Sequence, residues 1–164
     1  MIPINILKED LVIRSITKRD LDNIYKLIKD LNQNEHLVIQ DELNYDYIKS
    51  RYIETLANSM EYFCIIQKGS DLIGFLKGRL EQKNILESWL MALYLKKEYD
   101  NNKDLVLTTF EEYLEYIYNV NRFNVVINEE SRGFWIKNGY VFNRKMKHME
   151  MYLNSYIYTK KRGG

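Results

Sequence analysis

The sequence has few of the residues that most often build metal sites, disulfides and reactive thiols. Its 164 residues include one cysteine, Cys64, and two histidines, His36 and His148. A single cysteine excludes an internal disulfide and any zinc or iron–sulfur site built from several cysteines, and two histidines argue against a histidine-based metal site. Cys64 lies in an apolar segment, so we expect an inert core thiol rather than a nucleophile. For His148, which lies among methionines, we also expect a structural role.

Glycine is scarce as well, and its positions exclude the common phosphate-binding loops. The seven glycines cannot be drawn into a Walker loop or a GxGxxG turn, the patterns that cradle nucleotide phosphates. The GxSxG turn that presents a nucleophilic serine is also missing. The sequence therefore gives no support to the nucleotide-binding folds and hydrolases that depend on these motifs.

Charge of one sign is not in excess. The chain has 24 basic and 23 acidic side chains and a net charge of +1, whereas a nucleic-acid-binding domain is usually clearly basic. Its 14 tyrosines are spread along the chain without a basic stripe, so we do not expect nucleic acid as a partner. No stretch approaches the roughly 18 apolar residues of a membrane-spanning helix, and the first residues do not resemble a secretory signal. We therefore expect a cytoplasmic protein without membrane contact.

The composition fits a folded domain. Apolar residues make up 46% and charged residues 29% of the chain, close to the averages of globular proteins. We expect a single domain over residues 1–164, with an ordered fold from about 10 to 153. Residues 154–164 are expected to form a tail, whose basic end frays.

Hydrophobic periodicity predicts a strand and two helices in the first third of the chain. Leu11–Ile16 is typical of a strand, and Thr17 then caps a helix in which Asp20 completes a capping box. Apolar residues follow at helical spacing. Residues 32–43 are polar and acidic, as in a loop, and a second amphipathic helix covers about residues 45–56.

The remaining pattern is typical of an α/β fold. Strands are predicted at 61–67, 72–80, 85–95, 123–127, 140–144 and 148–153, a long helix around 106–117 and a short helix at 129–138. Gly69 lies in a turn, and Gly139 follows the short helix, where a left-handed C-terminal cap belongs. The order βααβββαβαββ predicts one mixed central sheet with helices on both faces.

Three segments resemble the GNAT superfamily of acetyl-CoA-dependent N-acetyltransferases. Asn128–Tyr140, with the sequence NEESRGFWIKNGY, is similar to the family segment N-x-x-A-x-x-F-Y-x-K-x-G-F. Leu93–Tyr99 (LYLKKEY) is similar to L-x-V-x-P-E-Y, which ends the family's fourth strand, and Leu11–Arg14 resembles the family's start. The resemblance covers about residues 10–153. It implies a GNAT-like fold and the transfer of an acetyl group from acetyl-CoA to a primary amine.

The sequence departs from the family pattern in two places. After the fourth strand the family has a glycine-rich R-G-x-G-x-G loop that aims backbone N–H groups at the CoA pyrophosphate, but residues 100–104 read DNNKD here. Asn101 and Asn102 can take the left-handed conformation at modest cost, and Lys103 would attract phosphate. The family's frequent general-acid tyrosine aligns with Trp135, whose indole N–H is no proton source at neutral pH.

The resemblance implies a set of residues that contact CoA. In the family, the pantetheine arm bonds to the backbone between the fourth and fifth strands, which corresponds here to the backbone of Leu93 and Leu95. Asn128 aligns with an asparagine that contacts pantetheine. The full expected set is Leu93, Leu95, Asn101, Asn102, Lys103, Asn128, Ser131, Phe134, Trp135 and Lys137.

Several of these residues have a purely structural alternative. Leu93 and Leu95 could be no more than buried strand residues, and Asn128 could cap the short helix. Phe134 and Trp135 could belong to the core. Lys137 could complement the C-terminal end of the short helix rather than a phosphate.

Amine attack on a thioester needs one group that accepts the amine's proton and another that returns a proton to the thiolate. Glu87 is the only carboxylate inside the strand at 85–95, and is therefore the candidate base, although a solvated strand end is the favoured interpretation. Tyr94 and Tyr140 are the candidate acids, in place of the tyrosine that the family has at the position of Trp135.

The acceptor is predicted from the connection between the first two helices, which lines the acceptor side of the cleft in the family. Here it holds Glu35, Asp41 and Glu42. Acidic walls concentrate cations, so these residues predict a small cationic amine, such as a polyamine. A solvated acidic loop explains them equally well.

The alternative function is a non-catalytic binding or assembly protein with the GNAT fold. Strands near residues 146–153 could also pair two copies into a homodimer.

Overall fold

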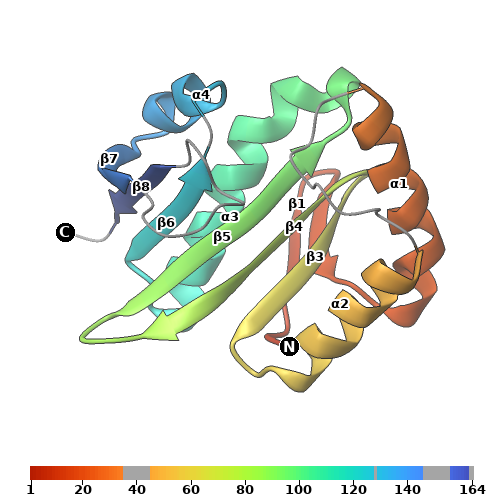
Figure 1. Cartoon of the computed structure of the whole chain (residues 1–164), viewed down its shortest axis with the longest axis horizontal. Coiled ribbons are helices and arrows are strands. Elements are labelled where there is room, and N and C mark those ends of the chain that lie inside the picture. Colours follow the sequence, from red (N-terminus) through yellow and green to blue (C-terminus); the bar gives the residue numbers. More distant parts are fainter. Residues whose placement is uncertain (35–44, 128, 146–155, 163–164) are drawn as a thin grey trace. The chain divides into compact units, whose positions relative to one another are not determined.

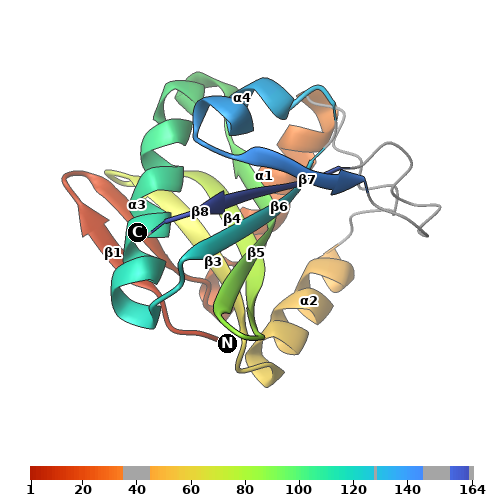
Figure 2. The same cartoon turned by 90° about the vertical axis from the view of Figure 1, so that its left-hand side faces the viewer.

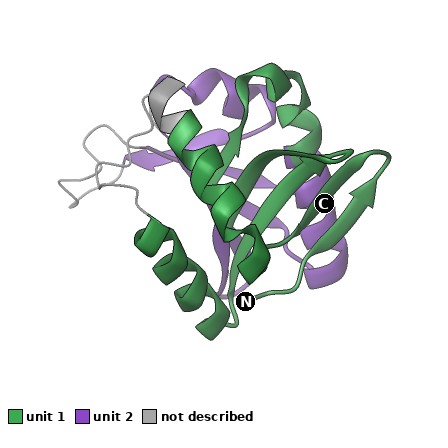
Figure 3. Cartoon of the chain, turned by 90° about the vertical axis from the view of Figure 1, so that its right-hand side faces the viewer, with its two compact units in different colours: residues 1–77, 92–106 green, residues 78–91, 107–164 purple. Residues whose placement is uncertain are grey.

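The computed structural model describes residues 1–34, 45–127, 129–145 and 156–162 (Figure 1, Figure 2). The strands form one eight-stranded sheet in the order β1-β2-β3-β4-β5-β6-β8-β7. β5 runs parallel to β6, whereas β2 is antiparallel to both β1 and β3. The fold is therefore mixed α/β, as the sequence predicts. The chain divides into two compact units, residues 1–77 with 92–106 and residues 78–91 with 107–164 (Figure 3), called unit 1 and unit 2 below.

Unit 1 begins with three antiparallel strands and two helices. They are β1 (Asn5–Lys8), β2 (Leu11–Ser15), α1 (Leu21–Asn34), α2 (Tyr45–Ala57) and β3 (Glu61–Lys68). α2 contacts both α1 and β3, and the core between helices and strands contains Ile24, Leu27, Phe63 and Phe75. β2, both helices and β3 are predicted from the sequence. β1 was not, because only Ile6 of its four residues is buried and the pattern is too short to stand out.

A 3-10 turn, Lys18–Asp20, leads into α1 and begins with the predicted capping box at Thr17. The backbone N–H and the hydroxyl of Thr17 donate to Oδ2 of Asp20 over 2.7 and 2.8 Å. Arg14 adds a two-pronged ion pair to the same carboxylate, at 2.8 and 2.9 Å. Burial alone would raise the pKa of Asp20, but the hydrogen bonds from Arg14 and Thr17 outweigh burial and lower it. These contacts fix the direction in which the chain leaves β2.

A hairpin of two long strands, β4 (Asp71–Gln82) and β5 (Leu86–Leu95), runs through both units. Gly69 takes a φ of +59° in the turn before β4, as predicted. Within unit 1, Gly74 of β4 lies so close to β5 that an added Cβ would overlap the carbonyl oxygen of Tyr94. Glycine at this position therefore permits the close approach of the two strands.

Unit 2 contains the strands β6 (Arg122–Ile127), β7 (Val141–Lys145) and β8 (Tyr156–Lys161) and the helix α4 (Arg132–Lys137). It also contains most of the helix α3 (Lys103–Tyr118), which starts in unit 1. β8 is antiparallel to β6 on one side and to β7 on the other. Figure 2 shows β6, β8 and β7 side by side in this order. The predicted strand at 148–153, and the pairing surface expected at 146–153, lie outside the described residues.

The expected frayed tail is wrong for residues 156–162. Tyr156–Lys161 form β8, an inner strand, and Ile157 and Tyr158 are 4% and 6% exposed. Two of the basic side chains that suggested fraying are bound at a buried carboxylate: Lys160 Nζ and Arg162 Nη1 lie 2.7 and 3.2 Å from Oε2 of Glu111. A long-range ion pair thus holds a segment whose local sequence favours disorder.

Glu111 lies on α3 and is fully buried. Besides the two cations at Oε2, its Oε1 accepts a 2.7 Å hydrogen bond from the hydroxyl of Tyr140. The ammonium group of Lys160 also lies 5.6 Å from the centroid of the Tyr140 ring. Both carboxylate oxygens are therefore paired, which offsets the cost of removing the charge from water. The contacts tie α3 to β8 and to the residue that precedes β7.

Replacing Gly74 should destabilise the protein through overpacking. We expect Gly74→Ala to lower the free energy of unfolding by about 1–3 kcal/mol or more, because the new methyl group meets backbone that cannot turn aside. The matched control is Gly133→Ala on α4, where an added Cβ has nothing within 4 Å. Urea unfolding of the three proteins measures the effect, and equal stability of the two variants would contradict it.

Removing the Glu111 carboxylate should lower the free energy of unfolding far more than removing the carboxylate of Glu112. Glu111→Ala removes the buried carboxylate that binds the partly buried Lys160 and leaves Arg162 with only the more exposed Glu112 and Glu115. We therefore expect a loss of about 3–5 kcal/mol in the free energy of unfolding. Glu112 has a half-exposed side chain 3.8 Å from Arg162, and Glu112→Ala should change stability by less than about 1 kcal/mol. Chemical denaturation measures both variants. Similar losses for the two would show that Glu111 does not anchor β8.

Candidate functional site

The resemblance to the GNAT superfamily implies that CoA lies against the second half of β5, most of which belongs to unit 1. β5 pairs with β6 from Glu87, opposite Arg122, to Leu90, opposite Val125. β5 then continues for five residues beyond this register, to Leu95. Its end is tied to β4 instead, since the N–H of Lys96 donates to the carbonyl of Ile73 over 2.7 Å.

Leu93 and Leu95 lie in this second half. Their side chains are 6% and 3% exposed, so the side chains belong to the core, as the sequence analysis expects. Any contact with a ligand would come from their backbone. That part of the prediction stays a prediction.

The segment after β5 forms a tight turn without glycine. Lys97–Asn102 form the 3-10 helix η2, and α3 begins directly at Lys103, whose φ and ψ are −62° and −40°. Asn101 and Asn102 do not use the left-handed conformation that is open to asparagine, because Glu9 and Asn119 are the only described non-glycine residues with positive φ. A 3-10 turn continues into an α-helix with right-handed angles throughout, so the chain reaches the start of α3 without glycine.

The beginning of α3 carries the positive end of the helix dipole. The N–H of Lys103, its first residue, donates to the carbonyl of Asp100 in the preceding 3-10 turn. Asn102 and Lys103 are half-buried at this point, and Asn101 is exposed. Asp100 and Asp104 bring negative charge to the same turn, which Lys97 and Lys103 oppose.

The predicted cofactor residues of unit 2 gather on the short helix α4. Ser131 precedes its first residue, and Gly139 after it has a φ of +88°, which confirms the left-handed cap. Trp135 is 5% exposed and packs edge-on against Phe134 and Tyr140, with ring centroids 5.0 and 5.1 Å apart. Lys137 lies in the last turn, as expected. Asn128 lies outside the described residues.

The side chain of Glu87 is 5% exposed, so the interpretation of Glu87 as a solvated strand end is wrong. Oε1 accepts a 2.7 Å ion-paired hydrogen bond from Nη1 of Arg122, and Oε2 accepts one of 3.2 Å from the amide of Asn124. Asn124 in turn accepts from the hydroxyl of Thr159 at 2.8 Å, and Asn143 donates to that hydroxyl at 2.9 Å. A connected polar network thus surrounds Glu87 within unit 2.

The network was not identified from the sequence. Asn124 interrupts the otherwise apolar run from Phe123 to Ile127, and a buried amide there signals a polar partner. The partners Arg122, Asn143 and Thr159 come from three different strands, and no sequence spacing connects them.

The two candidate acids differ in their surroundings. The hydroxyl of Tyr140 donates to Glu111, and its side chain is 1% exposed. Tyr94 is half-buried in unit 1, with its ring centroid 5.3 Å from that of Phe75.

Of the remaining predicted residues, Cys64 can be checked in the structure and several others lie outside the described part. Cys64 is fully buried and burial raises the pKa of its thiol strongly, which confirms an inert core residue. Glu35, Asp41, Glu42, His36 and His148 lie outside the described residues. In the ranges that the structure describes, no group of three or more His, Cys, Asp or Glu side chains could hold a metal ion. None of the helices described there is long and apolar enough to cross a membrane.

Comparison with solved structures supports the fold. The chain is similar to the PaiA N-acetyltransferase of Thermoplasma acidophilum in complex with coenzyme A, with a TM-score of 0.69, 19% identity, and coverage of 93% of this chain and 99% of that one. The chain is also similar to the spermidine N-acetyltransferase of Vibrio cholerae in complex with CoA and spermine, with a TM-score of 0.73, 13% identity, and coverage of 94% of this chain and 96% of that one. A Salmonella typhimurium acetyltransferase that modifies the N-terminal serine of a 50S ribosomal subunit protein has a TM-score of 0.76 and 13% identity, with coverage of 95% of this chain and 97% of that one.

Comparison with family sequence models identifies the family. No curated protein sequence matches the chain. The model described as "Acetyltransferase (GNAT) domain" matches residues 13–159, nearly the whole length. The predicted resemblance and the predicted acyltransferase class are confirmed: the chain belongs to the GNAT family of acetyltransferases.

Proposed function

We propose that this GNAT-family chain transfers an acetyl group from acetyl-CoA to a primary amine. The observation that carries the proposal is the family match over residues 13–159. Similar folds have been crystallised with coenzyme A. One similar protein is a spermidine N-acetyltransferase, and another modifies the N-terminal serine of a ribosomal subunit protein.

Residues at the end of β5 and the start of α3 fit a CoA group. The residues of β5 beyond Leu90 lie outside its register with β6, which suits backbone hydrogen bonds to an extended pantetheine arm. The positive end of the helix dipole at the start of α3 suits a pyrophosphate. Lys97 and Lys103 supply positive charge there, and Asn101 and Asn102 supply amide donors. From unit 2, Asn128, Ser131, Phe134, Trp135 and Lys137 stay predicted contacts.

In the reaction, acetyl-CoA would supply the acetyl group as a thioester. The chain's part is to orient the carbonyl, to stabilise its developing negative charge and to move protons. We assign the first two tasks to the backbone N–H groups of Leu93 or Leu95. The buried Leu side chains would exclude water from this backbone, which strengthens its hydrogen bonds.

Proton transfer is assigned by what each candidate already binds. Both oxygens of Glu87 accept hydrogen bonds and its side chain is buried, so we propose that it positions Arg122 and Asn124 rather than taking a proton directly. The hydroxyl of Tyr140 donates a hydrogen bond to Glu111. Tyr94 is the more exposed of the two tyrosines, and we propose it as the group that returns a proton to the thiolate.

A non-catalytic binding or assembly protein is the second candidate. The observation in its favour is that the position of the family's frequent acid tyrosine holds Trp135, which is buried among Phe134 and Tyr140. This alternative predicts a folded protein that does not transfer acetyl groups.

The acceptor class rests on residues outside the described part of the chain. The acidic connection with Glu35, Asp41 and Glu42 predicts a small cationic amine, and a homodimer is likewise a prediction. An acetyl-transfer screen of cationic and anionic amines at low and high salt separates the acceptor classes.

Acetyl-CoA should stabilise the protein measurably. A ligand at about 100 times its dissociation constant adds roughly 2.7 kcal/mol to the free energy of unfolding, which for a domain of this size raises Tm by about 5–10 °C. Thermal unfolding with and without millimolar acetyl-CoA measures the shift. No shift would contradict the proposal, and a shift without acetyl transfer to any amine would favour the non-catalytic alternative.

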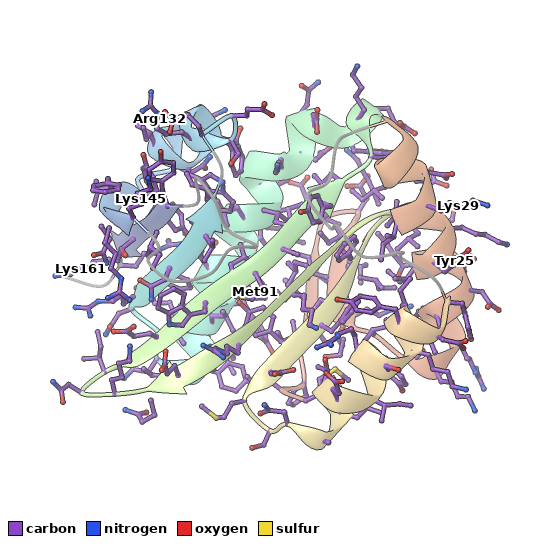
Figure 4. The ribbon with its side chains drawn as sticks, in the orientation of Figure 1. Tyr25, Lys29, Met91, Arg132, Lys145 and Lys161 are labelled. Carbon is purple, nitrogen blue, oxygen red and sulfur yellow. The ribbon has the colours of Figure 1, made fainter. Side chains whose placement is uncertain are left out.

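Reversing the charge of Lys103 should weaken CoA binding and leave folding intact. We expect Lys103→Glu to cost about 1–3 kcal/mol in binding, the size of a charge-assisted hydrogen bond. Lys29→Glu, at an exposed position on α1 (Figure 4), is the matched control and should bind CoA like the wild type. Calorimetric titration gives both affinities. Unchanged affinity in Lys103→Glu would place the phosphates elsewhere.

A further inference from the structure

Unit 2 contains a small cleft beside the Glu87 network. Its volume is about 180 Å³. It is lined by Lys83, Glu87, Trp89, Arg122, Asn124, Asn143 and Arg144. These residues come from β5, β6, β7 and the turn that precedes β5, and most of them are polar or charged. The lining therefore suits a polar ligand better than an apolar one.

The floor of the cleft is held rigidly by its own hydrogen bonds. Glu87 accepts from Arg122 and Asn124, and Asn124 is fixed in turn through Thr159, to which Asn143 donates. The guanidinium of Arg122 is thus oriented before any ligand arrives. Such preorganisation lowers the entropic cost of binding.

The cleft carries an excess of positive charge. Three of its lining side chains are cationic, and one, Glu87, is anionic. The Glu87 carboxylate is 5% exposed and its oxygens are occupied by Arg122 and Asn124, with Lys83 at 3.9 Å. Lys83 also forms an ion pair with Glu81, with Nζ 3.5 Å from Oε2. Arg144 is exposed and has no ion-pair partner among the residues that the structure describes.

We propose that this cleft binds one carboxylate or phosphate group of a small ligand. Arg144 supplies the unpaired guanidinium, Arg122 a second one held in place by Glu87, and Lys83 a further positive charge. Guanidinium groups match the oxygen pairs of carboxylates and phosphates with two parallel hydrogen bonds. The volume admits a group of a few heavy atoms, and the half-buried indole of Trp89 provides a wall for its apolar part.

The charge of this cleft is opposite to that of the acidic connection at residues 35–42, which predicts a cationic acceptor. The proposed site therefore takes a different chemical group from the one expected there. The proposal does not depend on acetyl transfer, because binding can be measured in the absence of acetyl-CoA. A lack of anion binding at this cleft would not contradict the proposed acetyl transfer. A lack of acetyl transfer would likewise not contradict anion binding at the cleft.

The experiment follows the two indole N–H signals of the full chain by NMR during titration. Trp89 lines the cleft, and Trp135, the other tryptophan, lies on α4; a Trp135→Phe variant assigns the signals. Succinate and inorganic phosphate should each be tested, with neutral succinamide as the control ligand. We expect the Trp89 signal to shift with succinate, phosphate or both, and not with succinamide. Which anion binds more tightly distinguishes a carboxylate from a phosphate ligand.

Two charge-neutralising variants on β7 complete the test. Arg144→Gln should weaken anion binding about tenfold or more, the effect of losing a charge-assisted hydrogen bond. Lys145→Gln removes the same charge from the next residue, also exposed but outside the cleft lining (Figure 4), and should change affinity by less than about twofold. Equal losses in both variants, equal binding of succinamide, or no shift of the Trp89 signal would overturn the proposal.

Discussion

The buried carboxylate of Glu111 is the interaction on which the rest of unit 2 depends. An isolated charge in the interior is very costly, so its three donors must all be in place for the folded state to be stable. Those donors come from the residue before β7 and from the end of the chain. In the folded state the carboxylate therefore couples α3 to β8 and to the residue that precedes β7.

Two further buried carboxylates are paired with arginine among the residues that the structure describes. Asp20 binds Arg14 where the chain leaves β2, and Glu87 binds Arg122 between neighbouring strands β5 and β6. In each pair the acid is the more buried partner, and the longer basic side chain keeps contact with solvent. Charged groups thus specify register and chain direction, a task for which apolar side chains are less selective.

Local signals in the sequence predict most elements of the fold. The capping box at Thr17, the turn at Gly69 and the cap at Gly139 each depend on neighbouring residues only, and the structure confirms them. β8 could not be predicted in this way, because Lys160 and Arg162 read as a solvated end until Glu111 is known to face them. Glu111 itself lies four residues after Leu107 and three before Leu114, on the apolar stripe of α3. A charge on such a stripe signals a distant partner but does not name it.

The burial of Cys64 in β3 has a practical consequence. It is the only thiol of the chain, and it pairs in register with Ser15 of β2. A thiol reagent can reach it only after the strands around it separate, since buried groups react through opened states. The rate of alkylation therefore reports how often unit 1 opens while unit 2 contributes no signal. An unmodified chain thus already carries a single, built-in label for local unfolding of one half of the molecule.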